Sequence, residues 1–337
     1  MRMLLLMLVL IAVPAHAAEL LVGNKAADTV WRLSLENGRR LGEFATGIGP
    51  HEIAVSADGR RAAVANYGRA QAGNTLTVVE LDGDAAPRTI DLGRHGRPHG
   101  MRFLPDSDRT VLVTTEASGA LLQVDLERGR IERTFEIGTG TGHMVAVAAD
   151  GRTAYVAKIA AGAVVRVDLD SGEVIEQAAG AGAEGIALRP GAQELWVSNR
   201  DAGTVTIHDP ATLAVRATLP SEGFPIRVAF TSDGRLALVT NAKAGTLAVF
   251  DARKRRRLAT VALARADREY KPTLLGRAAL PIGVIAHPSR PLAYVAIAGG
   301  DEIAVVDLRK YTVIDRWPTG REPDALAIGL SDGAGAR

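Results

Sequence analysis

Short segments in which apolar and polar residues alternate recur along almost the whole chain. One example begins with residues 50–55, turns at Asp58-Gly59 and continues through residues 62–66. Alternation with a period of two predicts half-buried β-strands, and an Asp-Gly pair between two such runs predicts a tight turn. The same pattern returns at residues 98–115, 142–158, 183–199, 225–241 and 281–297.

Each of these hairpins is followed by two more short strands, so one unit contains four strands over roughly 40 to 56 residues, a repeat length typical of a propeller blade. Residues 19–47 supply only the last three strands of a unit, and residues 323–328 supply only the first. Pairing these two segments closes the ring and completes a blade that would otherwise lack a strand and leave hydrogen-bonding groups open. We therefore predict an all-β fold, a seven-bladed β-propeller with four-stranded antiparallel blades, in which the C-terminal strand completes blade one.

The first residues have the layout of a secretory signal peptide. Arg2 gives a positive start, residues 4–13 are apolar, and Ala15-His16-Ala17 fits a cleavage site with small residues. A buried N-terminal strand or helix is the alternative. We expect residues 1–17 to be a signal peptide, residues 18–337 to form a single propeller domain, and the chain to be periplasmic or secreted, without a transmembrane anchor.

The composition excludes several classes of protein. Cysteine is absent, which rules out disulfides, iron–sulfur clusters, covalently attached c-type haem and a cysteine nucleophile. The formal net charge is +2 and aromatic residues make up only 4% of the chain, so we expect no nucleic-acid partner. We also expect a monomer.

The topology of a four-stranded blade separates two rims of the disc. The turns between the first and second strands are short and uniform, and they lie on one rim. The connections between the second and third strands and between successive blades lie on the other rim, where residues 67–74 and 264–280 form longer insertions. We call this second side the loop-rich rim and expect the functional site there, because loops on a rigid scaffold commonly carry function.

One position of the repeat carries ionisable residues in five neighbouring blades. Two residues before the central apolar residue of each first strand, the chain has Asp324, His51, His99, His143, Glu184, Ile226 and Ile282, in blade order. Three imidazoles and a carboxylate are a suitable ligand set for zinc or a similar divalent metal. We predict a metal site formed by His51, His99, His143, Glu184 and Asp324; the alternative is that each histidine only bonds to the backbone of a neighbouring blade.

Other polar residues on the same rim are candidates for ligand binding. They are Glu52 and Arg227 at the next position of the first strand, Asn66, Lys158, Asn199 and Asn241 at the ends of second strands, and Arg200 beside Asn199. Arg227 has the geometry to hold an anion with two hydrogen bonds, or to form an ion pair between blades. The asparagines are also typical of residues that bond to the following turn. Which of the two first-strand positions faces the channel stays open, because neighbouring side chains alternate. The basic run at residues 253–257 is expected at a solvated turn.

Several segments resemble the YVTN-repeat (tyrosine-valine-threonine-asparagine) propellers. These are Ala154–Ala157, Leu195–Asn199, Ala237–Asn241 and the Asp-Gly-Arg turns at 58–60, 150–152 and 233–235. The likeness covers nearly the whole mature chain, although Thr115, Lys158 and Ile297 stand where the family has asparagine. It implies a propeller fold. Its relatives include exported proteins without a known reaction, archaeal surface-layer proteins, the haem d1 domain of nitrite reductase and lactonase-like propellers.

These observations leave three functional hypotheses. The first is a non-catalytic periplasmic binding or scaffold protein, which uses the loop-rich rim for a small ligand or a protein partner. The second is a hydrolase or lyase that depends on a divalent metal, in which Glu52 or Glu184 moves a proton. The third is binding of haem or another tetrapyrrole through His51, His99 or His143.

Overall fold

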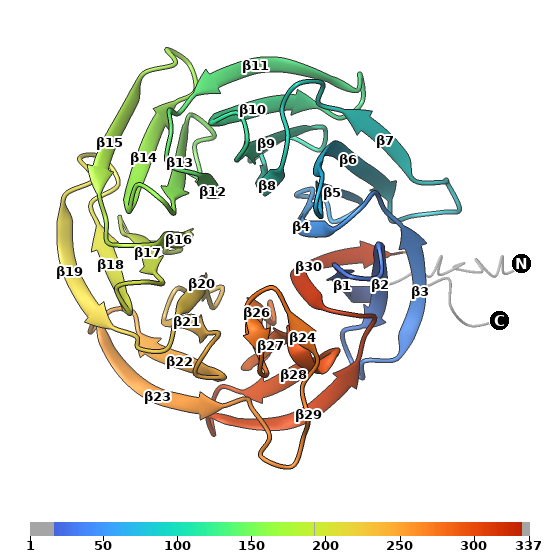
Figure 1. The fold of residues 1–337 in the computed structure, drawn as a ribbon, viewed down its shortest axis with the longest axis vertical. Helices are drawn as coiled ribbons and strands as arrows, with labels where there is room; N and C mark the ends of the chain where they lie inside the picture. The colour runs from blue at the N-terminus through green and yellow to red at the C-terminus, as the bar shows by residue number, and fades with distance from the viewer. Residues whose placement is uncertain (1–16, 192, 332–337) are drawn as a thin grey trace, which may run out of the picture.

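The computed structural model describes residues 17–191 and 193–331, which form seven four-stranded antiparallel sheets arranged in a ring (Figure 1). Within each blade we call the strands A to D, from the axis outwards. The ring of seven four-stranded sheets confirms the predicted fold. The predicted signal peptide lies outside the described residues except for Ala17, where β1 begins.

The blades follow one another along the chain. From A to D, the strands of blade one are β30 (Pro323–Ser331), β1 (Ala17–Asn24), β2 (Thr29–Ser34) and β3 (Arg40–Ala45), and those of blade two are β4 (Pro50–Val55), β5 (Arg61–Gly68), β6 (Ala72–Glu80) and β7 (Arg88–Asp91). Blade three has β8 (Pro98–Phe103), β9 (Thr110–Thr115), β10 (Ala120–Asp125) and β11 (Arg130–Glu136); blade four has β12 (Gly142–Val147), β13 (Thr153–Lys158), β14 (Ala163–Asp168) and β15 (Val174–Ala178); and blade five has β16 (Ala183–Leu188), β17 (Leu195–Asn199), β18 (Thr204–His208) and β19 (Val215–Pro220). Blade six has β20 (Pro225–Phe230), β21 (Leu236–Asn241), β22 (Thr246–Asp251) and β23 (Arg256–Ala262), and blade seven has β26 (Pro281–Ala286), β27 (Leu292–Ile297), β28 (Glu302–Asp307) and β29 (Thr312–Pro318).

Two insertions on the loop-rich rim are more regular than expected. In residues 67–74, β5 and β6 extend towards each other and Gly68 pairs with Ala72, so much of this segment is a hairpin rather than an irregular loop. In residues 264–280, β24 (Pro272–Thr273) and β25 (Gly276–Arg277) form a small two-stranded sheet. A short 3₁₀ helix, η1 (Ala298–Gly300), follows β27.

The ring closes between the two ends of the described chain. β30 pairs antiparallel with β1, with Leu20 opposite Ile328 and Val22 opposite Leu326, and Figure 1 shows the red and blue ends meeting in this blade. The pairing converts two incomplete units into one blade, as the sequence predicts. No helix in the described part of the chain is long and apolar enough to cross a membrane.

Neighbouring blades are held together near the axis by a repeated hydrogen bond. A hydroxyl near the end of strand B donates to a carbonyl on strand A of the next blade. Ser198 Oγ donates to Ile226 O at 2.9 Å, Thr240 Oγ1 donates to Ile282 O at 2.8 Å, and Thr114 Oγ1 donates to His143 O. These carbonyls belong to the repeat position that carries the histidines, so the bonds fix where that position lies.

The blades also approach closely at a glycine on strand A. A Cβ built on Gly283 would collide with the carbonyl oxygen of Asp324 in the next blade. We expect Gly283→Ala to lower the free energy of unfolding by about 1–3 kcal/mol, because a packed interface must move to accept the methyl group. Urea unfolding measures this change. Gly42→Ala is the matched control, because a Cβ at Gly42 meets open space, and an equal loss in both variants would contradict the explanation.

Two residues of the basic run form ion pairs instead of facing solvent alone: Arg257 pairs with the exposed Glu222, and Arg255 pairs with Glu194 of blade five. Arg255 Nη2 lies 2.8 Å from Oε1 of the buried Glu194, whose Oε2 accepts hydrogen bonds from Trp196 Nε1 and Arg189 Nη1, both at 3.2 Å. Burial alone would raise the pKa of Glu194, but these donors outweigh it and hold the pKa below its usual range.

Glu194 should therefore contribute to stability in a pH-dependent way. A lowered carboxyl pKa adds stability above the pKa of the unfolded chain, and that stability is lost as the pH falls through the folded-state pKa. We expect Glu194→Gln to cost about 1–3 kcal/mol at pH 7, and the difference from the native chain should shrink towards pH 3. Unfolding at both pH values measures it. Glu222→Gln, which removes an exposed pair with Arg257, should have little effect at either pH.

Candidate functional site

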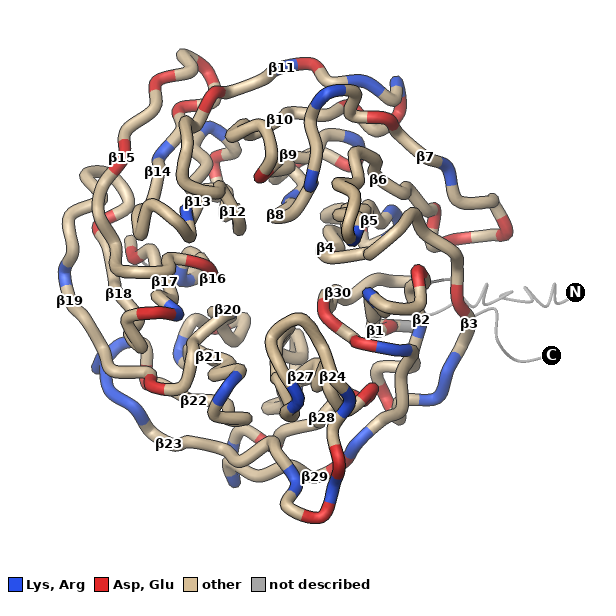
Figure 2. Tube along the Cα trace, viewed as in Figure 1, with Lys and Arg blue, Asp and Glu red and all other residues tan. Residues whose placement is uncertain are grey.

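All five predicted metal ligands lie together around the axis, at the starts of the strands A of blades one to five. Figure 2 marks acidic residues on β16 and β30 close to the axis. The pairing register between strands A and B shifts at this end of the blades, for example between Pro50 and Glu52 in blade two and between Pro225 and Arg227 in blade six. His51 and Glu52 are neighbours in the sequence, yet both contact residues of the axial cluster. Both first-strand positions therefore contribute to the cluster, although strict alternation would allow only one of them to do so.

The three histidine rings lie in contact, with His99 edge-on to His51 and tilted against His143. The ring centroid of His99 lies 4.2 Å from that of His51 and 3.5 Å from that of His143. His99 is fully buried, and neither of its ring nitrogens has a hydrogen-bond partner in the described part of the chain. A buried imidazole with both nitrogens unpartnered is costly, so this residue needs an explanation.

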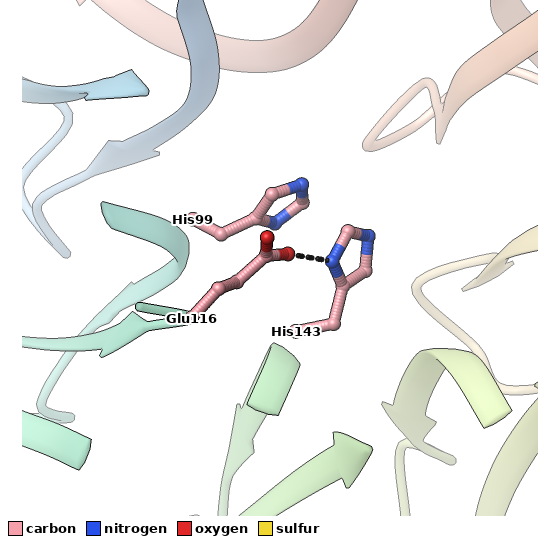
Figure 3. A group of neighbouring side chains, drawn as sticks. All are labelled: His99, Glu116 and His143. Atoms are coloured by element: carbon pink, nitrogen blue, oxygen red, sulfur yellow. Dashed lines mark hydrogen bonds and ion pairs between the residues drawn. The ribbon is translucent and has the colours of Figure 1, made fainter. Parts of the chain in front are cut away.

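Carboxylates surround the two outer histidines. His143 Nδ1 forms a short hydrogen bond with Oε1 of Glu116, as Figure 3 shows, and His143 Nε2 lies 3.3 Å from Glu184 Oε1. His51 Nδ1 lies 2.9 Å from Asp324 Oδ2. The hydroxyl of Tyr67 donates a hydrogen bond to Oε2 of Glu116. The predicted ligands therefore separate into a His51–Asp324 pair and a group centred on His143.

Arg227 links several of these carboxylates. Its guanidinium forms a short ion pair with Glu52 and lies 3.7 Å from Glu184 Oε1 and 3.9 Å from Asp324 Oδ1. Arg200 adds a second cation to Glu184 at 2.9 Å. Glu52, Arg200 and Arg227, which were predicted to bind a ligand, thus lie in the cluster and satisfy charges within it.

The surroundings set the protonation of each group. Burial, followed by the neighbouring His143, His51 and Arg227, holds the pKa of His99 well below its usual range, so His99 is neutral. Burial would lower the pKa of His143, but hydrogen bonds to Glu116 and Glu184 outweigh it and raise that pKa. Burial would raise the pKa of Glu116, but His143 and Tyr67 lower it, so Glu116 is a carboxylate.

The other predicted ligand-binding residues bond within their own part of the ring. Asn66 Nδ2 donates to Thr75 and Thr77 at 2.9 and 3.0 Å, and Lys158 Nζ donates to Ile137 O at 2.9 Å. The remaining two behave alike: Asn199 donates to Thr204 and Thr206, and Asn241 donates to Thr246. The structure does not bring these four side chains into the axial cluster.

Three cluster residues were not identified from the sequence: Lys25, Tyr67 and Glu116. In the repeat, each occupies the position that Arg200 has in blade five, directly after the residue equivalent to Asn199. Lys25 Nζ lies 3.4 Å from His51 Nε2 and 3.5 Å from Asp324 Oδ2. Comparing this one position around the ring would have found all three.

His99, Glu116 and His143 meet the requirements for holding a metal ion. Each offers one ligand atom, and these three atoms lie within 4.8 Å of one another. Figure 3 shows the Glu116 carboxylate beside both imidazole rings. Glu184 contacts His143 and Tyr67 donates to Glu116, so these two residues can orient the ligands from outside. Such outer partners are common around protein-bound metals.

Comparisons with known proteins support the fold and a distant relationship. No family model matches the chain, so membership of the YVTN-repeat family stays a prediction. The chain is 28% identical over 148 residues to "Uncharacterized protein YncE" of Salmonella typhi and to that of Salmonella typhimurium LT2, a match that covers 43% of this chain and 38% of each relative.

Two solved structures share the architecture. A functionally unknown protein from Desulfotomaculum acetoxidans has a TM-score of 0.76 at 14% identity, over 92% of this chain and 98% of its own. A chain of Kuenenia stuttgartiensis hydrazine synthase has a TM-score of 0.70 at 18% identity, over 86% and 92%. At these identities the likeness concerns the fold alone. The chain is a seven-bladed β-propeller with weak homology to YncE-type proteins.

Proposed function

We propose that this chain is an exported, periplasmic binding propeller, and that a zinc-like divalent metal held by His99, Glu116 and His143 is the centre of its binding site. The observation that carries the proposal is the buried, neutral His99, whose two ring nitrogens have no hydrogen-bond partner among the described residues. A neutral imidazole is the form that binds metal, and one such bond would satisfy a group that the protein otherwise leaves unpaired.

Zinc commonly takes four ligands, and sites with three protein ligands leave one position open. Here that position is available to a small ligand or to a side chain of a periplasmic partner approaching the loop-rich rim. Binding must displace the proton that His143 shares with Glu116, because a metal ligand has to be deprotonated.

Binding is favoured over catalysis because Glu52 and Glu184, the two carboxylates considered as proton carriers, are both held by other side chains. Glu52 is paired with Arg227, and Glu184 is held by Arg200, Arg227 and His143. Neither is free to act as a general base. A tetrapyrrole is less well supported, because the ring centroid of His99 lies 4.2 Å from that of His51 and 3.5 Å from that of His143, which leaves no room for a macrocycle between the rings.

The test is calorimetric titration of the chelator-treated chain, purified from the periplasm, with Zn²⁺ in two buffers of different ionisation enthalpy. We expect one ion per chain, with release of a proton, and no comparable binding of Mg²⁺, which prefers oxygen ligands. A chain that neither takes up Zn²⁺ nor retains a stoichiometric metal by elemental analysis would refute the proposal.

A further inference from the structure

A second feature of the axis lies on the side away from the histidines. A cavity of 590 Å³ begins at Glu52 and Arg227 and extends along the strands A as far as Ala57, Pro105 and Pro190, which belong to the turns between strands A and B. This volume is in the range of pockets that hold small organic ligands. It includes neither the proposed metal ligands nor any loop of the loop-rich rim.

One repeat position contributes a residue from every blade to the lining of the cavity. Directly after the central apolar residue of strand A, the blades carry Ala327, Ala54, Arg102, Ala146, Ala187, Ala229 and Ile285, and all seven line the cavity. Five alanines leave the space open, and the side chain of Arg102 is the one long polar group at this level. It is exposed to that space.

Arg102 forms no ion pair within the part of the chain that the structure describes. Its Nη1 donates to the carbonyl oxygen of Met101 at 2.9 Å, and no carboxylate in the described part of the chain forms an ion pair with it. The cavity contains two other charged residues, Glu52 and Arg227, which are paired with each other. The lining therefore has one uncompensated positive charge. Burial also lowers the pKa of Arg102, which is the expected consequence of placing a cation in such surroundings.

The wall between Arg102 and the outer turns is apolar. The next position of strand A supplies Val55, Phe103, Val147, Leu188, Phe230 and Ile328 to the lining. A molecule that enters from the turns therefore first meets an apolar collar and then a single guanidinium.

We propose that this cavity binds an amphipathic monocarboxylate, with the carboxylate on Arg102 and the hydrocarbon part inside the collar. A guanidinium and a carboxylate form two parallel hydrogen bonds, which would satisfy donors that the protein leaves free. The hydrocarbon part would bury its surface against the two phenylalanines and the aliphatic residues. The inference is independent of the metal site, because none of its residues is a proposed metal ligand.

The probe is sodium decanoate, titrated by calorimetry into the chain with and without a metal chelator. Decanoate should bind one to one in both conditions. Acetate, which lacks the hydrocarbon tail, and decanol, which lacks the charge, should each bind at least about tenfold more weakly, because each loses one favourable contact. Arg102→Met should weaken decanoate binding by a similar factor, Arg102→Lys should weaken it less, and Ala187→Phe should abolish it by filling the cavity.

The control is Arg235→Met, an exposed arginine in the A–B turn of blade six, which should bind decanoate like the native chain. Thermal unfolding checks the fold of every variant; Arg102→Met should be at least as stable as the native chain, since it removes an unpaired cation. Failure of the native chain to bind decanoate would overturn the inference. So would equal affinity for decanol, or unchanged affinity in Arg102→Met.

Discussion

Replacing His99 with alanine is expected to weaken Zn²⁺ binding by more than about a hundredfold, since the loss of even an outer partner of a metal ligand typically costs 10–100-fold. His99 is the proposed ligand with no other bonding role, because neither of its ring nitrogens has a hydrogen-bond partner in residues 17–191 and 193–331. Its removal should therefore affect the metal far more than the fold. Calorimetric titration of the variant, together with thermal unfolding without metal, separates these two effects.

His95→Ala is the matched control for this experiment. His95 is also a buried histidine of blade three near the loop-rich rim, but its Nδ1 bonds to Ser118 and it lies outside the cluster. The control should bind Zn²⁺ with native affinity. If His99→Ala also bound Zn²⁺ with native affinity while remaining folded, the metal would have to be held elsewhere.

Replacing Arg227 with methionine is expected to lower the free energy of unfolding by about 3–5 kcal/mol, the usual cost of removing one partner from a buried ion pair. Arg227 is almost fully buried and faces Glu52, Glu184 and Asp324. Methionine keeps much of the side-chain volume but leaves these carboxylates without their shared cation. Urea unfolding at pH 7 measures the loss.

Two further variants make this result interpretable. Arg200→Met removes the less buried cation beside Glu184 and should cost clearly less, because Arg227 remains. Arg227→Lys keeps the charge but loses the planar guanidinium, so an intermediate loss is expected. A change below about 1 kcal/mol in Arg227→Met would show that the carboxylates find other partners, and our description of Arg227 as the link between them would be wrong.

The fold was predictable because its information is local and repeated. Each Asp-Gly turn between alternating runs specifies a hairpin, and the incomplete units at residues 19–47 and 323–328 specify ring closure, which the pairing of β1 with β30 confirms. The hairpin in residues 67–74 was missed because its turn contains no pattern shared with the other blades.

The axial site was only partly predictable. The repeat frame identified the level at which His51, His99 and His143 lie, but it does not specify where the side chains at the end of strand B point, and Tyr67 near the end of β5 and Glu116 directly after β9 come from there. The frame also grouped Asn66, Lys158, Asn199 and Asn241 with the site, although hydrogen bonds within the ring hold these side chains away from it.

By itself, the amino-acid sequence determined that seven similar units surround one axis and which repeat positions approach it. The tertiary structure alone decided the partners there: Glu116 with His143, Asp324 with His51, Arg227 with Glu52, and Arg102 with no carboxylate of the described residues. The physical reason is that strand pairing depends on backbone patterns that every blade shares. Contacts at the axis depend instead on the length and charge of individual side chains that meet from different blades.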